Sequence, residues 1–143
     1  MRSDAQQLIQ ALKSAGLKTA IFTGDDSQTG KSLAQSLQVD LLHTGMSPED
    51  KIEAVRQLAQ HETVLMIGDG VNDAGAMAAA SSAIAIAPRA VLVQQSADAT
   101  LLSPTLSALP ATLNFAKRCR RVIRQTVAWS LLYNFTAIPL ALA

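Results

Sequence analysis

The sequence is poor in cysteine and in aromatic residues. It contains one cysteine, Cys119, one tryptophan, one tyrosine and three phenylalanines among 143 residues. A single cysteine excludes an internal disulfide framework, so apolar packing has to hold the fold together. Residues 1–10 lack the apolar run and cleavage pattern of a signal peptide, so export by that route is not expected. We assign Cys119 no role, because it reads as an ordinary thiol on a helix surface.

Acidic residues are missing from the C-terminal part of the chain. Residues 117–143 carry five Lys and Arg and no Asp or Glu, whereas residues 1–116 carry seven basic and eleven acidic residues. The net charge of +1 therefore hides two different environments. The uncharged run from Gln125 to Ala143 has about the length that crosses a bilayer core. With 49% hydrophobic and 16% charged residues, the chain can bury one ordinary core.

Segments with the apolar pattern of strands alternate along the chain with segments that have the apolar spacing of helices. Short apolar runs, typical of buried strands, are predicted at 17–22, 39–43, 63–67 and 82–86. Helices are predicted before Gly16 and at 27–38, 47–60 and 73–80, with a long helix from about Thr105. This order predicts an α/β fold with a Rossmann-like parallel sheet and helices on both of its faces, followed by a long C-terminal helix.

Two acidic turns follow predicted strands, at 23–26 ("TGDD") and at 68–73 ("GDGVND"). The carboxyl ends of parallel strands meet at one edge of a sheet, so the turns are expected to converge. Carboxylates gather where a divalent cation neutralises them, and hard oxygen ligands suit magnesium. Asp69 and Asp73 are therefore candidate magnesium ligands. Taken alone, the second turn is also compatible with a simple turn and a helix N-cap without metal.

Three small or polar residues share this second turn with the two aspartates. Gly68 and Gly70 let the backbone approach a ligand closely. Asn72 can hold the turn or cap the helix that follows. We therefore expect these three residues to belong to the same binding site as the carboxylates.

The end of the first predicted strand offers groups that can bind phosphate oxygens. Thr23, Gly24 and Asp25 supply a hydroxyl and free backbone N–H groups. Lys51, on the first turn of the helix at 47–60, could aim its ammonium at the same phosphate. The plainer alternatives are a capped turn and a surface lysine. A hydroxyl, a lysine and a carboxylate pair in this order match the needs of phosphoryl transfer, where positioning and charge neutralisation carry catalysis.

Three motifs resemble those of a known superfamily. "TGDD" at Thr23, "PEDK" at Pro48 and "GDGVNDAGAM" at Gly68 resemble the second, third and fourth motifs of the haloacid dehalogenase superfamily. They are most similar to the phosphorylation domain of P-type cation pumps. "VAWSLLYNFTAIPLALA" is similar to a transmembrane helix of heavy-metal pumps that carries a Tyr-Asn pair used for copper(I).

The resemblance implies roles for individual residues and two cofactors, Mg²⁺ and ATP. It implies that Thr23 binds the phosphoryl oxygens and Lys51 pairs with an aspartyl phosphate. Asp69 would ligate magnesium, with Asp73 supporting the site. ATP would be bound mainly by a domain that these residues do not include.

Two further residues, Tyr133 and Asn134, would help bind the transported ion by the same resemblance. Their plainer reading is an interfacial tyrosine and an amide that packs against another helix. The resemblance also divides the chain into the C-terminal part of a phosphorylation domain (1–104), a basic stalk helix (105–124) and a truncated transmembrane helix (125–143).

The sequence departs from the family pattern in several places. It contains no Asp-Lys-Thr-Gly-Thr motif with the phosphorylated aspartate, no Thr-Gly-Glu motif and no Cys-Pro-Cys ion site. Asp26 stands where Asn is usual, Gly75 where Pro is usual, and 87–91 ("APRAV") where a Gly-Ser-Gly-Thr-Asp loop is expected. We therefore expect that the chain alone cannot complete a pumping cycle, and that it is a fragment of a longer product or a relic.

The leading hypothesis is a segment of an ATP-driven heavy-metal exporter, with copper(I) as the expected ion. Its partners would be the actuator and nucleotide-binding domains, the other membrane helices and the ion, and nucleic acid is not expected. It would lie in the cell (inner) membrane, with residues 1–124 on the cytoplasmic side, where basic residues accumulate. Two alternatives stay open: a soluble phosphatase of the same superfamily, and a non-enzymatic module tethered to the membrane.

Overall fold

The computed structural model describes residues 4–87, 91–102 and 105–142, and the chain divides into two units, Met1–Ser107 and Ala108–Ala143. The departure at Pro88 and Arg89 lies outside the described residues.

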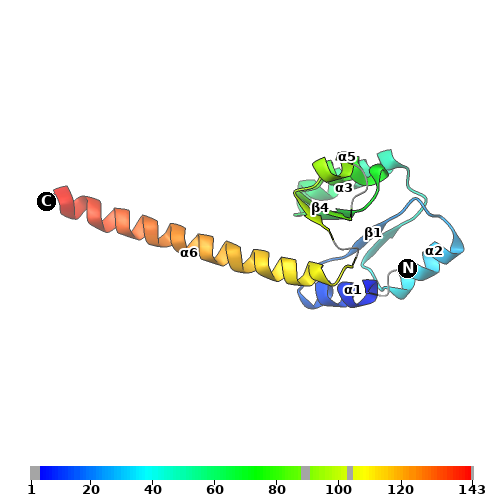
Figure 1. Ribbon diagram of the computed structural model, residues 1–143, viewed down its shortest axis with the longest axis horizontal. Coiled ribbons are helices and arrows are strands. Elements are labelled where there is room, and N and C mark those ends of the chain that lie inside the picture. Colours follow the sequence, from blue (N-terminus) through cyan, green and yellow to red (C-terminus); the bar gives the residue numbers. More distant parts are fainter. Residues whose placement is uncertain (1–3, 88–90, 103–104, 143) are drawn as a thin grey trace. The chain divides into compact units, whose positions relative to one another are not determined.

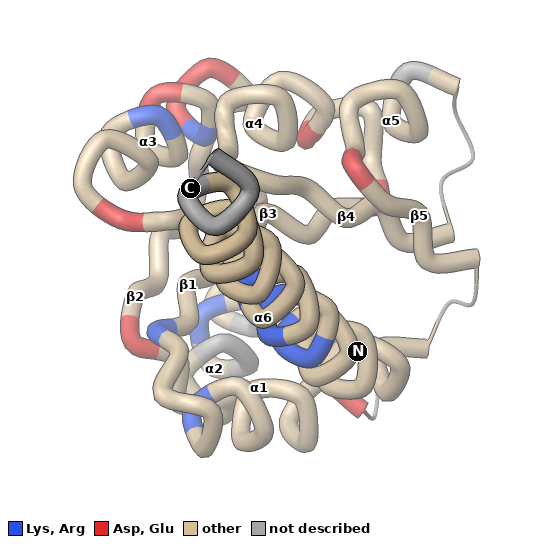
Figure 2. Tube along the Cα trace, turned by 90° about the vertical axis from the view of Figure 1, so that its left-hand side faces the viewer, with Lys and Arg blue, Asp and Glu red and all other residues tan. Residues whose placement is uncertain are grey.

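The first unit alternates helices and strands in the predicted order. Its elements are α1 (Ala5–Ser14), β1 (Ala20–Phe22), α2 (Gln28–Ser36), β2 (Leu41–His43), α3 (Pro48–His61), β3 (Leu65–Gly68), the 3-10 turn η1 (Val71–Asp73), α4 (Ala74–Ala79), β4 (Ser82–Ile86), α5 (Val91–Gln95) and β5 (Ala99–Leu101). Every strand pair is parallel. In Figures 1 and 2 the strands lie between α3, α4 and α5 on one side and α1 and α2 on the other. The predicted α/β class with parallel strands is therefore confirmed.

The strands form two sheets where the sequence predicted one. β1 pairs with β2, and β4 lies between β3 and β5. Two elements, α5 and β5, were not predicted. Each is at most five residues long, too short to show a helical or a strand period in the sequence.

The core of the first unit forms where α4 and α5 meet β4. Met77, Ala83, Ala85 and Val93 are at most 2% exposed and pack together. β4 is buried over its last four residues, which agrees with its continuous apolar sequence and with cover on both faces. Small side chains on β4 let the helices approach it closely, and this packing fixes the end of the neighbouring strand β3.

α3 begins with a complete capping box. The hydroxyl of Ser47 accepts a hydrogen bond from the N–H of Asp50, and the Asp50 carboxylate accepts one from the N–H of Ser47. Pro48 occupies the first helical position, where its missing N–H costs nothing. Val55, 1% exposed, anchors the inner face of the helix. The cap and this anchor together fix the direction of the first turn, which carries Lys51.

The second unit is a single helix, α6 (Ala108–Leu142), of 35 residues. It begins close to the predicted start at Thr105. Figure 2 shows Lys and Arg residues on it and no Asp or Glu among its described residues. Among the residues that the structure describes, no helix has both the length and the apolar character needed to cross a membrane.

Candidate phosphate and metal site

Lys51 and Asp73 meet in an ion pair that joins two of the predicted motifs. The Nζ of Lys51 lies 2.8 Å from Oδ1 of Asp73, and the two side chains are 12% and 20% exposed. Lys51 comes from the first turn of α3 and Asp73 from the turn after β3, 22 residues away. The structure therefore places Lys51 beside one of the two predicted carboxylates, Asp73, and its low exposure disagrees with the plainer reading of a surface lysine.

The glycines of the second turn lie against the same aspartate. A Cβ atom added at Gly68 would lie 3.1 Å from Cβ of Asp73 and 3.2 Å from Sδ of Met77. The N–H of Asp73 donates to the carbonyl of Gly70 at 3.1 Å. A larger residue at position 68 would therefore crowd Asp73, which fills the space beside Gly68. The close approach predicted for this glycine is made to Asp73 of its own turn.

Asn72 does not cap the helix that follows. It lies inside the turn η1, and α4 has Asp73 at its N-cap position without a side-chain capping bond. Of the two roles considered for Asn72, the structure excludes capping of α4, because the chain turns one residue further before α4 begins. Asn72 and Asp69 are both exposed on this turn.

Thr23 and Gly24 lie beside the loop that leads into α3. The N–H of Thr23 donates to the carbonyl of His43, and the N–H of Met46 donates to the carbonyl of Thr23, both at 3.0 Å. A Cβ atom at Gly24 would lie 3.2 Å from the carbonyl oxygen of Met46. Through Met46 and the α3 cap, the first turn is connected to Lys51.

Asp25 stabilises its own turn. Its N–H donates to Oγ1 of Thr23 at 3.1 Å, and its carboxylate accepts from the N–H of Ser27 at 2.8 Å. These bonds with Ser27 hold the pKa of the Asp25 carboxyl below its ordinary value. Two of the backbone N–H groups expected to be free for phosphate, those of Thr23 and Asp25, are thus bonded within the chain. The Thr23 hydroxyl keeps its own proton to donate.

Asp26 has a linking role that the sequence analysis missed. Its carboxylate lies 2.6 Å from the Nζ of Lys31 and accepts a 3.0 Å hydrogen bond from the hydroxyl of Thr44. The hydrogen bonds with Lys31 and Thr44 lower the pKa of the Asp26 carboxyl. Gly45 turns beside it with φ of +66°, in the left-handed region that favours glycine. In the sequence, Thr44 and Gly45 after β2 were the only sign of this second contact between the first acidic turn and the loop before α3.

The carboxylates at this site can supply only part of the ligands that a magnesium ion needs. The residues that the structure describes include no group of three or more His, Cys, Asp and Glu placed to hold a metal. Magnesium usually takes one or two carboxylates and completes its shell with water and phosphate oxygens. The exposed Asp69 at the end of β3 suits that role, whereas Asp73 already neutralises Lys51.

The two residues expected to bind a transported ion lie on α6. Tyr133 is 69% exposed and Asn134 is also exposed. Consecutive residues of a helix point about 100° apart. Their side chains therefore leave α6 in different directions.

Comparisons with known proteins agree with the motifs. Residues 1–81 match the haloacid dehalogenase-like hydrolase family. A copper-exporting P-type ATPase of Staphylococcus haemolyticus is 33% identical over 99% of this chain, which spans only 18% of that relative. The crystal structure of a zinc-transporting PIB-type ATPase in its E2.Pi state matches 99% of the chain and 24% of its own, with 36% identity and a TM-score of 0.87.

A smaller solved structure matches less of the chain. The cobalt-bound deoxy-D-mannose-octulosonate 8-phosphate phosphatase from Haemophilus influenzae is 25% identical, with a TM-score of 0.63, and the match covers 72% of this chain and 62% of that one. The similarity to P-type ATPases predicted from the motifs is therefore confirmed, and it extends over nearly the whole chain.

Proposed function

The chain belongs to the haloacid dehalogenase-like hydrolase family, and on that basis we propose that it is the phosphate- and magnesium-binding segment of an ATP-driven heavy-metal pump. The observation that carries this proposal is the extent of the similarity. The match to the zinc-transporting pump covers 99% of the chain and that to the phosphatase covers 72%. A pump therefore accounts for both units, including the long helix α6. Copper(I) is the proposed ion, following the name of the copper-exporting relative.

Within this function Lys51 and Thr23 act on the phosphoryl group. The ammonium of Lys51 lies 2.8 Å from Asp73 and is held by the capped first turn of α3, so it can pair with a phosphate oxygen without losing its position. The Thr23 hydroxyl donates its proton to another oxygen. Both groups stabilise negative charge on the transferred phosphoryl, which is the main way that such reactions are catalysed.

Mg²⁺ is the proposed metal, with Asp69 as its ligand from this chain and Asp73 in a supporting position. The ion would neutralise charge on the phosphoryl oxygens when bound. Asp73 supports the site by fixing Lys51, and Gly68 and Gly70 leave room for Asp73. Asn72 lines the turn, and Gly24 and Asp25 shape the turn that presents Thr23.

The nucleophilic aspartate is proposed to come from a strand outside this sequence. The chain contains no Asp-Lys-Thr-Gly-Thr motif. β1 and β3 each form an edge of a separate parallel sheet. The turn after β1 is bonded to Met46 in the loop before α3, and Lys51 of α3 is paired with Asp73 in the turn after β3. A strand that pairs with both edges would join the sheets and bring its own carboxyl end to the same site. The isolated chain is accordingly not expected to turn over ATP.

The rest of the pump supplies the other proposed partners: actuator and nucleotide-binding domains, ATP bound mainly by the latter, and further membrane helices. The proposed location is the cell (inner) membrane, with residues up to 124 on the cytoplasmic side because Lys and Arg concentrate there. Tyr133 and Asn134 are proposed to help bind the transported ion.

The experiment that tests this function starts with the source cells. An antibody against residues 47–62 should detect a membrane protein several times heavier than 15.1 kDa. That protein should form an acid-stable, hydroxylamine-sensitive phosphoenzyme from labelled ATP, and Asp69→Asn should lower the labelling at least tenfold. Glu53→Gln, the same carboxylate-to-amide change on the exposed face of α3, is the matched control and should leave labelling intact. A band at 15.1 kDa alone, with metal-dependent hydrolysis of a phosphate monoester by the chain itself, would instead establish a phosphatase.

A further inference from the structure

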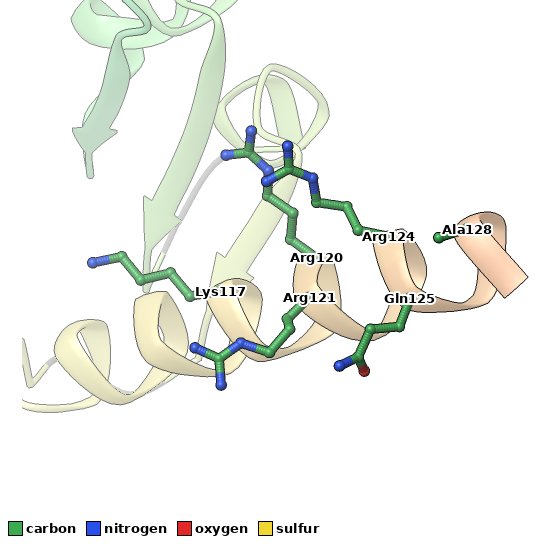
Figure 3. A pocket seen from close by; sticks show the side chains of 6 residues that line it. All are labelled: Lys117, Arg120, Arg121, Arg124, Gln125 and Ala128. Atoms are coloured by element: carbon green, nitrogen blue, oxygen red, sulfur yellow. The ribbon is translucent and has the colours of Figure 1, made fainter.

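Four of the five basic residues of α6 line a hollow on the surface of that helix. The hollow has a volume of about 520 Å³. Its lining residues are Lys117, Arg120, Arg121, Arg124, Gln125 and Ala128. Figure 3 shows the long basic side chains extending from this stretch, with Arg120 and Arg124 directed to the same side of the helix. We call it the basic hollow.

The charges in the basic hollow have no counter-charge close by in the sequence. Residues 117–143 contain no Asp or Glu, and none of the basic residues of α6 forms an ion pair with another described residue. Arg120 and Arg124 stand one turn apart, a spacing at which like charges destabilise a helix. An anion bound between them would remove that repulsion. Arginine guanidinium groups bind phosphate in a bidentate manner, which favours a phosphate group as the anion.

A second, apolar hollow continues directly from the first. It has a volume of about 200 Å³ and is lined by Gln125, Ala128, Trp129 and Leu132. Gln125 and Ala128 line both hollows. Trp129 is 69% and Leu132 51% exposed, so this apolar surface is uncovered within the described chain. One ligand can thus lie along α6 with a negative end at the arginines and an apolar end at Trp129 and Leu132.

From this juxtaposition we infer that α6 carries a binding site for an anionic phospholipid. The lipid phosphate lies between Arg120 and Arg124, with Arg121 adding positive charge nearby, and the start of an acyl chain lies on Ala128 and Leu132 beside the Trp129 ring. Tryptophan prefers the depth of the lipid headgroups, and clusters of Lys and Arg next to an apolar helical stretch attract anionic lipids.

Nucleic acid fits the same surface less well. Single strands bind where aromatic side chains stand between the basic ones and stack with the bases, and residues 117–124 contain no aromatic residue. An RNA phosphate chain would also leave the apolar hollow uncovered. The inference does not depend on the proposed pump function, because it uses only residues of α6.

Vesicle flotation with the full 143-residue chain tests the inference. Binding to an equimolar mixture of phosphatidylglycerol and phosphatidylcholine should exceed binding to phosphatidylcholine alone. The triple variant Arg120→Gln, Arg121→Gln and Arg124→Gln should lower the partition coefficient for the mixed vesicles about 100-fold, and circular dichroism should show α6 still formed. The double variant Trp129→Ser and Leu132→Ser should also lower the partition coefficient for the mixed vesicles.

A matched control separates the site from net charge. The variant Lys18→Gln, Lys31→Gln and Arg56→Gln removes the same charge from the first unit and should leave the partition coefficient within about threefold of the original. An equal loss in this control would overturn the inference, as would equal binding to both kinds of vesicle. Tighter binding of the chain to single-stranded RNA than to the mixed vesicles, abolished by the α6 triple variant, would overturn it in favour of nucleic acid.

Discussion

Replacing Lys51 by methionine should destabilise the first unit by about 2–3 kcal/mol, less than the ~3–5 kcal/mol that a fully buried pair costs when one partner is removed. The ammonium lies 2.8 Å from Oδ1 of Asp73, with side chains 12% and 20% exposed. At an effective dielectric constant of about 20, that separation corresponds to an attraction of ~6 kcal/mol, much of which the cost of removing two charges from water offsets. The residual exposure lowers the cost further, because solvent screens the aspartate left behind.

A double-mutant cycle isolates the pair itself. Lys51→Met and Asp73→Asn should each destabilise the unit, and the double variant should be more stable than the sum of the two losses predicts, with a coupling free energy of about 2 kcal/mol. The exposed pair between Lys18 and Glu62, 2.6 Å apart, is the control. It should show no resolvable coupling, because solvent screens pairs of this kind.

The assay has to report on the first unit alone. Fluorescence does not, because Trp129 and Tyr133, the single tryptophan and tyrosine, both lie in α6. Hydrogen exchange of the amides in β4 gives the free energy of global unfolding of the first unit. A coupling below about 0.5 kcal/mol for Lys51 and Asp73 would refute the reasoning, since that lies within the additivity error of such cycles.

Three further predictions concern the stability of the first unit. Hydrogen bonds from the Thr19 hydroxyl and N–H lower the pKa of Asp40. The stability that Asp40 contributes is therefore present above about pH 4 and is lost as the pH falls through its lowered pKa. In the variant Asp40→Asn, the urea concentration at the unfolding midpoint should therefore fall less on acidification than in the original chain. Ser47→Ala removes the cap of α3 and should cost about 1 kcal/mol by the same hydrogen-exchange measurement, with no loss contradicting the capping box. Met77→Ala empties a core position that is 2% exposed and should cost about 2–5 kcal/mol, whereas a loss below about 1 kcal/mol would mean that the core repacks.

The sequence by itself determined the elements whose signals are local. Apolar runs marked β1 to β4, and in β4, which is buried over its last four residues, the reason is that a strand covered on both faces needs a continuous apolar segment. Ser47 and Pro48 marked the start of α3 because capping depends only on neighbouring residues. The two acidic turns followed predicted strands, and parallel strands end at one edge, so a common site for these turns could be predicted from the order of elements.

Only the tertiary structure decided which residues of the site contact one another. Asp73 pairs with Lys51 across 22 residues, and Asp26 ties the first turn to the loop before α3. Such contacts depend on where separate elements pack, and the spacing of apolar residues within one element does not determine that. The same holds for the division into two sheets, because strand pairing is set by neighbours in space. The difference is physical: caps and periods act within a few residues of the chain, whereas ion pairs and sheet edges form between segments that only folding brings together.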